Sequence, residues 1–219
     1  MSALTQDFWT IMAPAELHPD LAQYKETLSE FEAIRHPLVF SVPYFDMENN
    51  RLNLFYEHKK KQLAIAIADN DLHKIVYLYE RPYRLDAFME HSTKVSDELY
   101  WSVFSSIWVD TENFYQKHEK WHEMLLQRPN SYLMMNLDEV NYLNNLPDVI
   151  TVFRGTKYAK NGMSWSLSKE RAQWFANRVG GKLYRTTVHK KNVFAYFNRR
   201  NEHEIVIDPS DCHIELINA

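Results

Sequence analysis

Apolar residues recur at helical spacing through the middle of the chain, and they alternate or cluster in short runs towards its end. The helical spacing predicts four helices and one longer stripe. They cover residues 59–68, 72–80, 85–91 and 133–143, with the longest stripe between 97 and 126. Asp69-Asn70-Asp71 has the composition of a turn between the first two helices. Residues 38–42 and 52–56 fit either short strands or docked apolar segments, because periodicity does not separate the two.

Beyond residue 148, short runs rich in β-branched and aromatic residues predict strands around one helix. The strands are expected before Arg154 and over 183–189, 193–198, 204–208 and 213–217. Ser168 is a suitable N-cap for the helix at 169–178, and Gly180-Gly181 is a suitable end. We therefore expect an α+β fold, with a mainly helical region over 1–148 and a catalytic core over 149–219, the two packed as one unit.

Glycine and charge are distributed unevenly along the chain. The 4 glycines all lie between Gly155 and Gly181. Turns before residue 155 therefore depend on Pro, Asn, Asp and Ser, which favours helices joined by capped turns over a glycine-dependent β meander. Residues 1–150 carry 13 Lys and Arg against 23 Asp and Glu, net −10, whereas residues 151–219 carry 12 against 6, net +6. A basic C-terminal part fits a polyanionic ligand or acceptor, although uneven sampling of a solvated surface gives the same numbers.

The chain shows no sign of secretion or membrane insertion. Cys212 is the single cysteine, so no internal disulfide can form, and a reducing compartment such as the cytoplasm is expected. An exported toxin without disulfides is the alternative. No apolar run approaches the length of a membrane span, and residues 1–14 lack the basic start and long apolar stretch of a signal peptide.

Three short motifs follow strand-like runs in the C-terminal part. The first places Arg154 and Gly155 after two apolar residues. Arginine offers five donors in a fixed plane to a phosphate, and glycine lets the backbone approach a flat ring. The second is Ser164-Trp165-Ser166, and the third is Glu202-His203-Glu204. The chemistry of these residue types fits a site for an anionic dinucleotide.

The third motif places two carboxylates close together. In an extended strand, Glu202 and Glu204 would point to the same face. Two like charges side by side repel each other, which should separate their proton affinities. Such a pair fits a site where the two carboxylates have different roles.

The order of the three motifs resembles the mono-ADP-ribosyltransferases of the arginine–serine–glutamate class, a group that includes bacterial toxins and phage enzymes. The resemblance covers roughly residues 150–217, and only nine residues separate Arg154 from Ser164, fewer than in many members. It implies two small β-sheets packed around a cleft for NAD, which acts as co-substrate, and it implies no metal. The implied reaction cleaves the nicotinamide–ribose bond of NAD and transfers ADP-ribose to a nitrogen of a macromolecule.

The resemblance also assigns roles to the motif residues. Arg154, Gly155 and Ser166 are implied to contact NAD. Ser164 would orient Glu204, which would stabilise the oxocarbenium-like centre as nicotinamide leaves.

Glu202 would then accept a proton from the attacking nitrogen. In the family this glutamate is associated with arginine modification, but the exocyclic amine of a base needs a proton acceptor as well.

The turn before the third motif is where the resemblance places acceptor recognition. Phe197, Arg199 and Arg200 combine an aromatic ring with two cations, which fits stacking and phosphate contact on single-stranded nucleic acid. The same residues also fit a solvated hairpin tip. The charge of this region favours a nucleic-acid base, RNA in particular, whereas the Glu-x-Glu motif favours protein arginine. A toxin or phage-defence role, with a neutralising antitoxin or chaperone as partner, follows by analogy alone.

Two other chemistries are less well supported by the sequence. His118 and His122 belong to an H-E-x-x-H pattern that on a helix could hold zinc for a metal hydrolase, but no third ligand is marked out and lysines flank the pattern. Both histidines also lie on the aromatic stripe, where they fit the edge of a core. The chain contains no glycine-rich dinucleotide or phosphate-loop motif. An enzyme that only hydrolyses NAD, or an inactive binding module, remains a further alternative.

Overall fold

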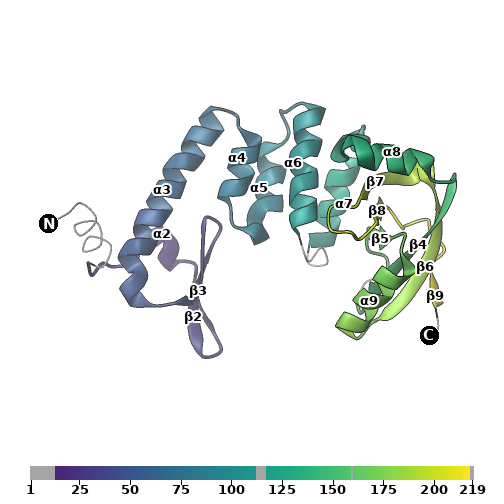
Figure 1. The fold of residues 1–219 in the computed structure, drawn as a ribbon. Helices are drawn as coiled ribbons and strands as arrows, with labels where there is room; N and C mark the ends of the chain where they lie inside the picture. Colours follow the sequence, from purple (N-terminus) through teal and green to yellow (C-terminus); the bar gives the residue numbers. More distant parts are fainter. Residues whose placement is uncertain (1–12, 112–116, 159, 218–219) are drawn as a thin grey trace. The chain divides into compact units, whose positions relative to one another are not determined.

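The computed structural model describes residues 13–111, 117–158 and 160–217 of the chain. These residues form helices and two antiparallel sheets, which confirms the α+β class (Figure 1). They belong to two compact units, Met1–Lys94 and Val95–Ala219. The division expected from the sequence lay later, between residues 148 and 149. The predicted stripe at 97–126 and the predicted helix at 133–143 therefore belong to the same unit as the candidate motifs.

The first unit combines a three-stranded meander with helices. Its strands are β1 (Lys25–Leu28), β2 (Phe31–His36) and β3 (Val39–Tyr44), paired in the order β1-β2-β3. Its helices are α2 (Pro19–Ala22), α3 (Asn49–Ala68), α4 (Leu72–Leu78) and α5 (Arg84–His91). The core of this unit lies where the sheet meets α2 and α3, and its buried members include Leu21, Ile34, Val39, Leu52 and Tyr56.

Local signals account for some of these elements and not for others. The expected turn between two helices is present, with Asn70 at φ 54° and the Asp71 side chain accepting from the Lys74 amide at 2.9 Å. The unit contains a meander beside its helices, but the meander does not depend on glycine, because Ser29 adopts a left-handed φ of 51° in the β1–β2 turn. Residues 52–56 lie inside α3, which begins ten residues before the predicted start.

The helices of the second unit are α6 (Asp97–Asp110), α7 (His118–Leu126) and α8 (Leu137–Asn145). The stripe expected between 97 and 126 is therefore two helices, since Thr111 is extended at ψ 130° and ends α6. Aromatic residues dominate the interior of this layer. The rings of Trp108 and Trp121 meet edge to face at 5.3 Å, and Phe104 packs against both. No helix among the described residues has both the length and the apolar character required to cross a membrane.

The sheet of the second unit has six strands in the order β7-β8-β5-β4-β6-β9, all paired antiparallel. The strands are β4 (Val149–Thr156), β5 (Ser164–Ser166), β6 (Lys182–His189), β7 (Val193–Phe197), β8 (Glu204–Ile207) and β9 (Glu215–Ile217). The four strands predicted after residue 182 are thus confirmed, with small differences at their ends. Val152, Trp165 and Ile205, from three neighbouring strands, are buried in one core with Leu143 of α8.

The sequence led us to expect two separate small sheets in this region, and this expectation was wrong. The strands form one sheet, but β4 and β5 are joined by a single pair, Phe153 with Ser166, whereas β4 and β6 pair over eight positions. The sheet therefore consists of two three-stranded halves, β7-β8-β5 and β4-β6-β9, that meet at one pair.

Helix α9 (Lys169–Val179) lies along β4 and β6 (Figure 1). Its ends are those that the sequence predicts: the Ser168 side chain accepts from the Arg171 amide at 3.1 Å, and Gly180 ends the helix at φ 59°. Gly155 lies directly against this helix, since a Cβ there would come within 1.9 Å of the Ala172 carbonyl oxygen. Helix–strand packing therefore accounts for the glycine at 155, and the contact with NAD expected for Gly155 stays a prediction.

Candidate active site

Three motif residues are linked across adjacent strands of the six-stranded sheet. The guanidinium of Arg154, on β4, donates from Nη1 to the backbone carbonyl of Ser164, on β5. The side chain of Ser164 in turn hydrogen-bonds the carboxylate of Glu204, on β8. The fold thus brings one residue from each of the three sequence motifs into a connected chain of polar contacts.

Glu204 is a buried carboxyl group with several polar neighbours. Only 5% of the residue is exposed, and Trp108 of α6 donates its indole N–H to Oε1 at 3.1 Å. Burial raises the pKa of Glu204, and the nearby charge of Glu202 acts in the same direction. Hydrogen bonds from Ser164 and Trp108, together with the charge of Arg200, lower the pKa and partly oppose the effect of burial.

Trp108 is a functional candidate that the sequence did not reveal. Its ring lies in the aromatic core of the helical layer, and the residue is 1% exposed. An aromatic residue at helical spacing is most simply interpreted as core packing, and nothing in its sequence neighbourhood marks the N–H as a donor to a carboxylate.

Arg154 is held in place from two sides. A Cβ at Gly162 would lie 2.3 Å from its Nη2 atom, so the guanidinium packs directly on that glycine. Burial lowers the pKa of Arg154 to about 10, while the negative charge of Glu204 acts in the opposite direction. Arg154 therefore keeps its positive charge at neutral pH, close to the carboxylate of Glu204.

Glu202 comes near Glu204 by a route other than strand periodicity. Strand β8 begins only at Glu204, and His203 has a left-handed φ of 47°, so the two glutamates are not alternate residues of one extended strand. Glu202 forms ion pairs with Arg200 at 3.2 Å and with Arg171 at 3.8 Å. Both carboxylates nevertheless line the same hollow, because the left-handed turn at His203 directs the loop back towards β8.

The hollow is small, with a volume of about 180 Å³. Its lining comes from α6, the end of β7 and the turn before β8: Val109, Phe197, Arg199, Arg200, Glu202 and Glu204. Sites for small molecules usually span about 300–1,000 Å³, so in this conformation the hollow is too small for a whole dinucleotide. The two carboxylates and the cation of Arg200 give the hollow a strongly polar lining.

Ser166 has a structural position. Its hydroxyl donates to the Glu202 carbonyl at 2.7 Å and accepts from the Ser168 amide at 3.0 Å, and the residue is 7% exposed. These two bonds fix the loop before β8 against the start of α9. Ser166 therefore holds the backbone of Glu202 in place, and the contact with NAD that the resemblance implies for Ser166 stays a prediction.

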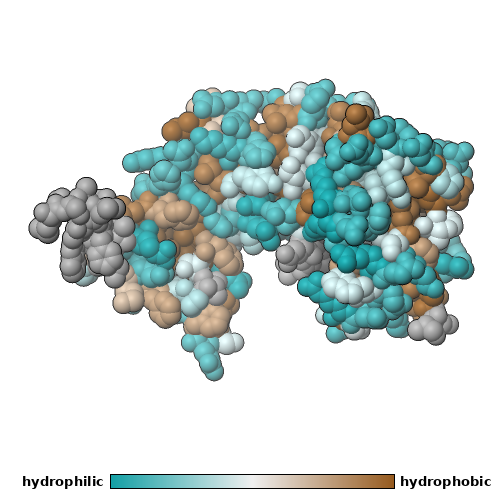
Figure 2. Space-filling view, viewed as in Figure 1, coloured by the Kyte–Doolittle hydropathy of each residue, from teal (hydrophilic) through white to brown (hydrophobic). Residues whose placement is uncertain are grey.

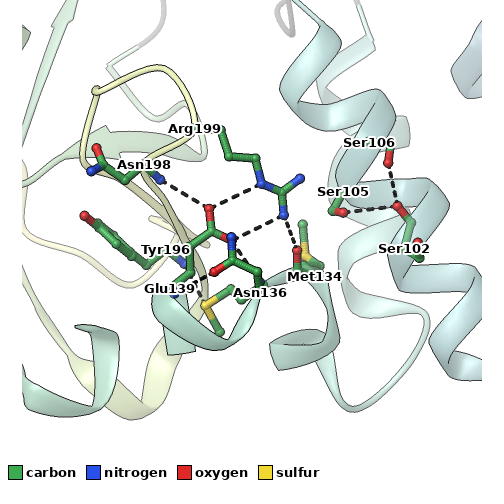
Figure 3. A network of polar contacts seen from close by, with 10 residues as sticks. Ser102, Ser105, Ser106, Met134, Asn136, Glu139, Tyr196, Asn198 and Arg199 are labelled. Atoms are coloured by element: carbon green, nitrogen blue, oxygen red, sulfur yellow. Dashed lines mark hydrogen bonds and ion pairs between the residues drawn. The ribbon is translucent and has the colours of Figure 1, made fainter. Parts of the chain in front are cut away.

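Arg199 and Phe197 are also engaged within the protein. Figure 3 shows the Arg199 guanidinium turned towards Glu139 and the Met134 carbonyl, at 3.3 Å and 2.9 Å. Glu139 is 4% exposed and forms a capping box with Asn136 at the start of α8. Phe197 is buried beneath the Arg199 guanidinium, which lies 4.9 Å from its ring centroid. All three residues expected to recognise the acceptor line the hollow, and Arg200 is paired there with Glu202.

The two histidines of the H-E-x-x-H pattern lie on α7, as the helical alternative requires. His122 Nε2 lies 2.9 Å from Oδ2 of Asp208, and the two imidazole rings are stacked with centroids 6.4 Å apart. Burial lowers the pKa of His118, as do the charges of His122 and Arg154. Within 13–111, 117–158 and 160–217, no three His, Cys, Asp or Glu side chains are grouped to hold a metal ion. Here the pattern supplies a His–Asp contact.

Comparisons with protein-family models, with curated proteins and with solved structures give no match for this chain.

Proposed function

We propose that this protein is a mono-ADP-ribosyltransferase that cleaves the nicotinamide–ribose bond of NAD and transfers ADP-ribose to a nitrogen of a macromolecule. The observation that supports the proposal is the connected series Arg154–Ser164–Glu204 on strands β4, β5 and β8. A cation for phosphate, an orienting hydroxyl and a buried carboxylate are the three groups that this reaction requires.

The roles of these residues follow from their surroundings. Arg154 supplies positive charge for the phosphates of NAD. Glu204, held by Ser164 and Trp108, is aimed at the ribose carbon that becomes positively charged as the glycosidic bond breaks. The bonding electron pair leaves with nicotinamide, which departs as a neutral molecule. Burial disfavours the ionised form of Glu204, so a positive charge that develops on the sugar beside it stabilises that form. The stabilisation is greatest at the transition state, where the charge on the sugar is largest.

Glu202 lies at the same hollow and accepts the proton that the acceptor nitrogen loses when it bonds to the ribose carbon. Its ion pair with Arg200 keeps the carboxylate oriented along the wall of the hollow. Separate positions for the two glutamates, one in the strand and one in the turn, fit separate roles in bond cleavage and in transfer.

Release of nicotinamide from NAD by the purified protein tests the proposal. Glu204→Gln should remove at least about 100-fold of the activity, in hydrolysis and in transfer, because the charge that stabilises the transition state is lost. Glu202→Gln should lose transfer while keeping most NAD hydrolysis. Arg154→Ala should mainly weaken NAD binding.

Glu215→Gln is the matched control, since Glu215 is a strand carboxylate paired with Arg185 on β6. The proposal fails if wild-type protein releases no nicotinamide, or if Glu215→Gln and Glu204→Gln lose activity equally. Equal loss of hydrolysis and transfer in Glu202→Gln would contradict the separate roles of the glutamates. An unchanged affinity for NAD in Arg154→Ala would contradict the phosphate contact.

A further inference from the structure

Helix α9 carries a stripe of alternating cations and an aromatic ring on one face. Arg171, Trp174 and Arg178 are spaced three and four residues apart, which places them one above another along the helix. From the first to the last the stripe covers eight residues, or about 10 Å of helix. The spacing of these three residues can be read from the sequence alone.

The geometry of the stripe leaves the indole accessible between two cations. Trp174 is 46% exposed, and the guanidinium carbons of Arg171 and Arg178 lie 4.9 Å and 5.3 Å from its ring centroid. The face of the molecule over α9 is mostly hydrophilic in Figure 2. Because both guanidinium groups lie over the ring, a base that stacks on the exposed indole would take the place of one of them, and the phosphates beside the base would meet the cations.

The stripe continues directly to the candidate active site. Arg171 is paired with Glu202 at 3.8 Å, and Glu202 is paired with Arg200 at 3.2 Å on the wall of the hollow. A strand that stacked on Trp174 would therefore lie next to the carboxylate that is proposed to accept the acceptor's proton.

A second cation–aromatic contact lies near the other end of α9. Gly181, just after the helix, packs against the backbone of Thr156 and Lys157. Tyr158 follows, 74% exposed, with the Lys157 ammonium 5.5 Å from its ring centroid. Both ends of the stripe thus offer positive charge, in a region, residues 151–219, whose net charge is +6.

We propose that this face of α9 binds single-stranded nucleic acid and delivers a base to the hollow beside Glu202. Binding as such depends only on the stripe, whereas delivery to Glu202 rests on the proposed transferase function. A single strand is required because base faces are open to stacking only when they are not paired in a duplex. A guanidinium acceptor on a protein would instead meet repulsion from Arg171, Arg178 and Arg200.

Fluorescence anisotropy without NAD tests the binding surface. The probe is a fluorescein-labelled single-stranded RNA of mixed sequence, about 16 nucleotides long, which is the upper end of known site sizes. Trp174→Ala should weaken binding at least about fivefold, the factor for loss of one stacked base. Arg178→Ala should reduce the slope of log affinity against log salt by about 0.7, the value for one phosphate contact on a single strand.

Arg185→Ala is the matched control, because it removes one exposed cation of the same unit from β6, where Arg185 is paired with Glu215. Affinity should change little in this variant, and unlabelled duplex RNA should compete poorly. Equal losses in Arg185→Ala and Arg178→Ala, with no loss in Trp174→Ala, would show attraction by net charge alone and would overturn the proposal. Equal competition by duplex would overturn it as well. Thermal melting of each variant shows whether its fold is intact, and Arg178→Ala serves alone if Trp174→Ala is unfolded.

The two proposals fail in different ways. If the wild-type protein binds the RNA but releases no nicotinamide from NAD, the transferase function fails and the binding surface stands. If it binds no RNA and transfers labelled ADP-ribose only to protein, the binding surface is wrong and the transferase function stands. Incubation with labelled NAD and a mixture of RNA and total protein distinguishes these outcomes.

Discussion

Replacement of Trp108 by phenylalanine removes one hydrogen bond from Glu204 while it keeps an aromatic ring in the core. Hydrogen bonds to charged groups contribute about 1.5–3 kcal/mol, which corresponds to about 10- to 150-fold in rate when the bond acts in the transition state. The Trp108 bond is 3.1 Å long, near the upper end of the usual range of about 2.7–3.2 Å. We therefore expect a loss near the lower limit, about 10- to 30-fold in kcat for nicotinamide release.

The variant should also change the pH dependence of the reaction. Trp108 lowers the pKa of Glu204, so without this donor the pKa rises further and the ionised form appears only at higher pH. The acidic limb of the pH–rate profile should therefore move to higher pH. A carbon-13 titration of labelled glutamate carboxyl groups measures the same change directly, without dependence on activity.

Trp101→Phe separates this effect from a general loss of packing. Trp101 lies on the same helix, is equally buried, and donates its indole N–H to the Pro129 carbonyl at 2.8 Å. The Trp101→Phe variant should lower thermal stability about as much as Trp108→Phe does, but it should leave the pH–rate profile unchanged. If both variants shift the profile equally, or if neither does, the contact between Trp108 and Glu204 does not tune the carboxylate.

Three further predictions concern stability and binding. Glu204→Gln should raise the melting temperature at pH 7, because folding raises the pKa of Glu204 and the folded protein therefore loses stability as the pH rises through that pKa. The gain should vanish near pH 4, and no gain at pH 7 would contradict the burial of charge. Arg199→Ala removes the ion-pair partner of Glu139 and should lower the free energy of unfolding by about 2 kcal/mol, measured with denaturant. This is less than the ~3–5 kcal/mol for a fully buried pair, because the Arg199 side chain is 32% exposed. Unchanged stability would favour a role in recognition. Gly162→Ala should displace Arg154 and raise the KM for NAD about 10-fold with little change in kcat, and unchanged kinetics would count against a positioned guanidinium.

The parts of the fold that depend on local signals were predictable from the sequence. The cap at Ser168 and the left-handed end at Gly180 bound α9 because their chemistry acts within one turn. The meander of the first unit was not predictable, since Ser29 takes a conformation that glycine usually supplies and that tertiary packing has to support.

The site was predictable in its residue types and only partly in its geometry. Arg154, Ser164 and Glu204 are brought together, as motif order and strand patterning indicate. The arrangement of Glu202 was not foreseen, because strand periodicity assumes extended backbone and His203 is left-handed. Trp108 lies far from the motifs in sequence, and no local pattern distinguishes an indole that donates to a carboxylate from one that fills a core.

The sparse seam between β4 and β5 has a mechanical consequence. Arg154 belongs to one half of the sheet and Glu204 to the other, and among strand pairings only Phe153 with Ser166 ties β4 to β5. A small splay of the halves about that pair would widen the gap between guanidinium and carboxylate without breaking the extensive β4–β6 ladder. The described residues that line the hollow come from α6, β7, β8 and the turn between the two strands, and none comes from β4. Such a splay would therefore change the distance between Arg154 and the hollow and not the width of the hollow itself.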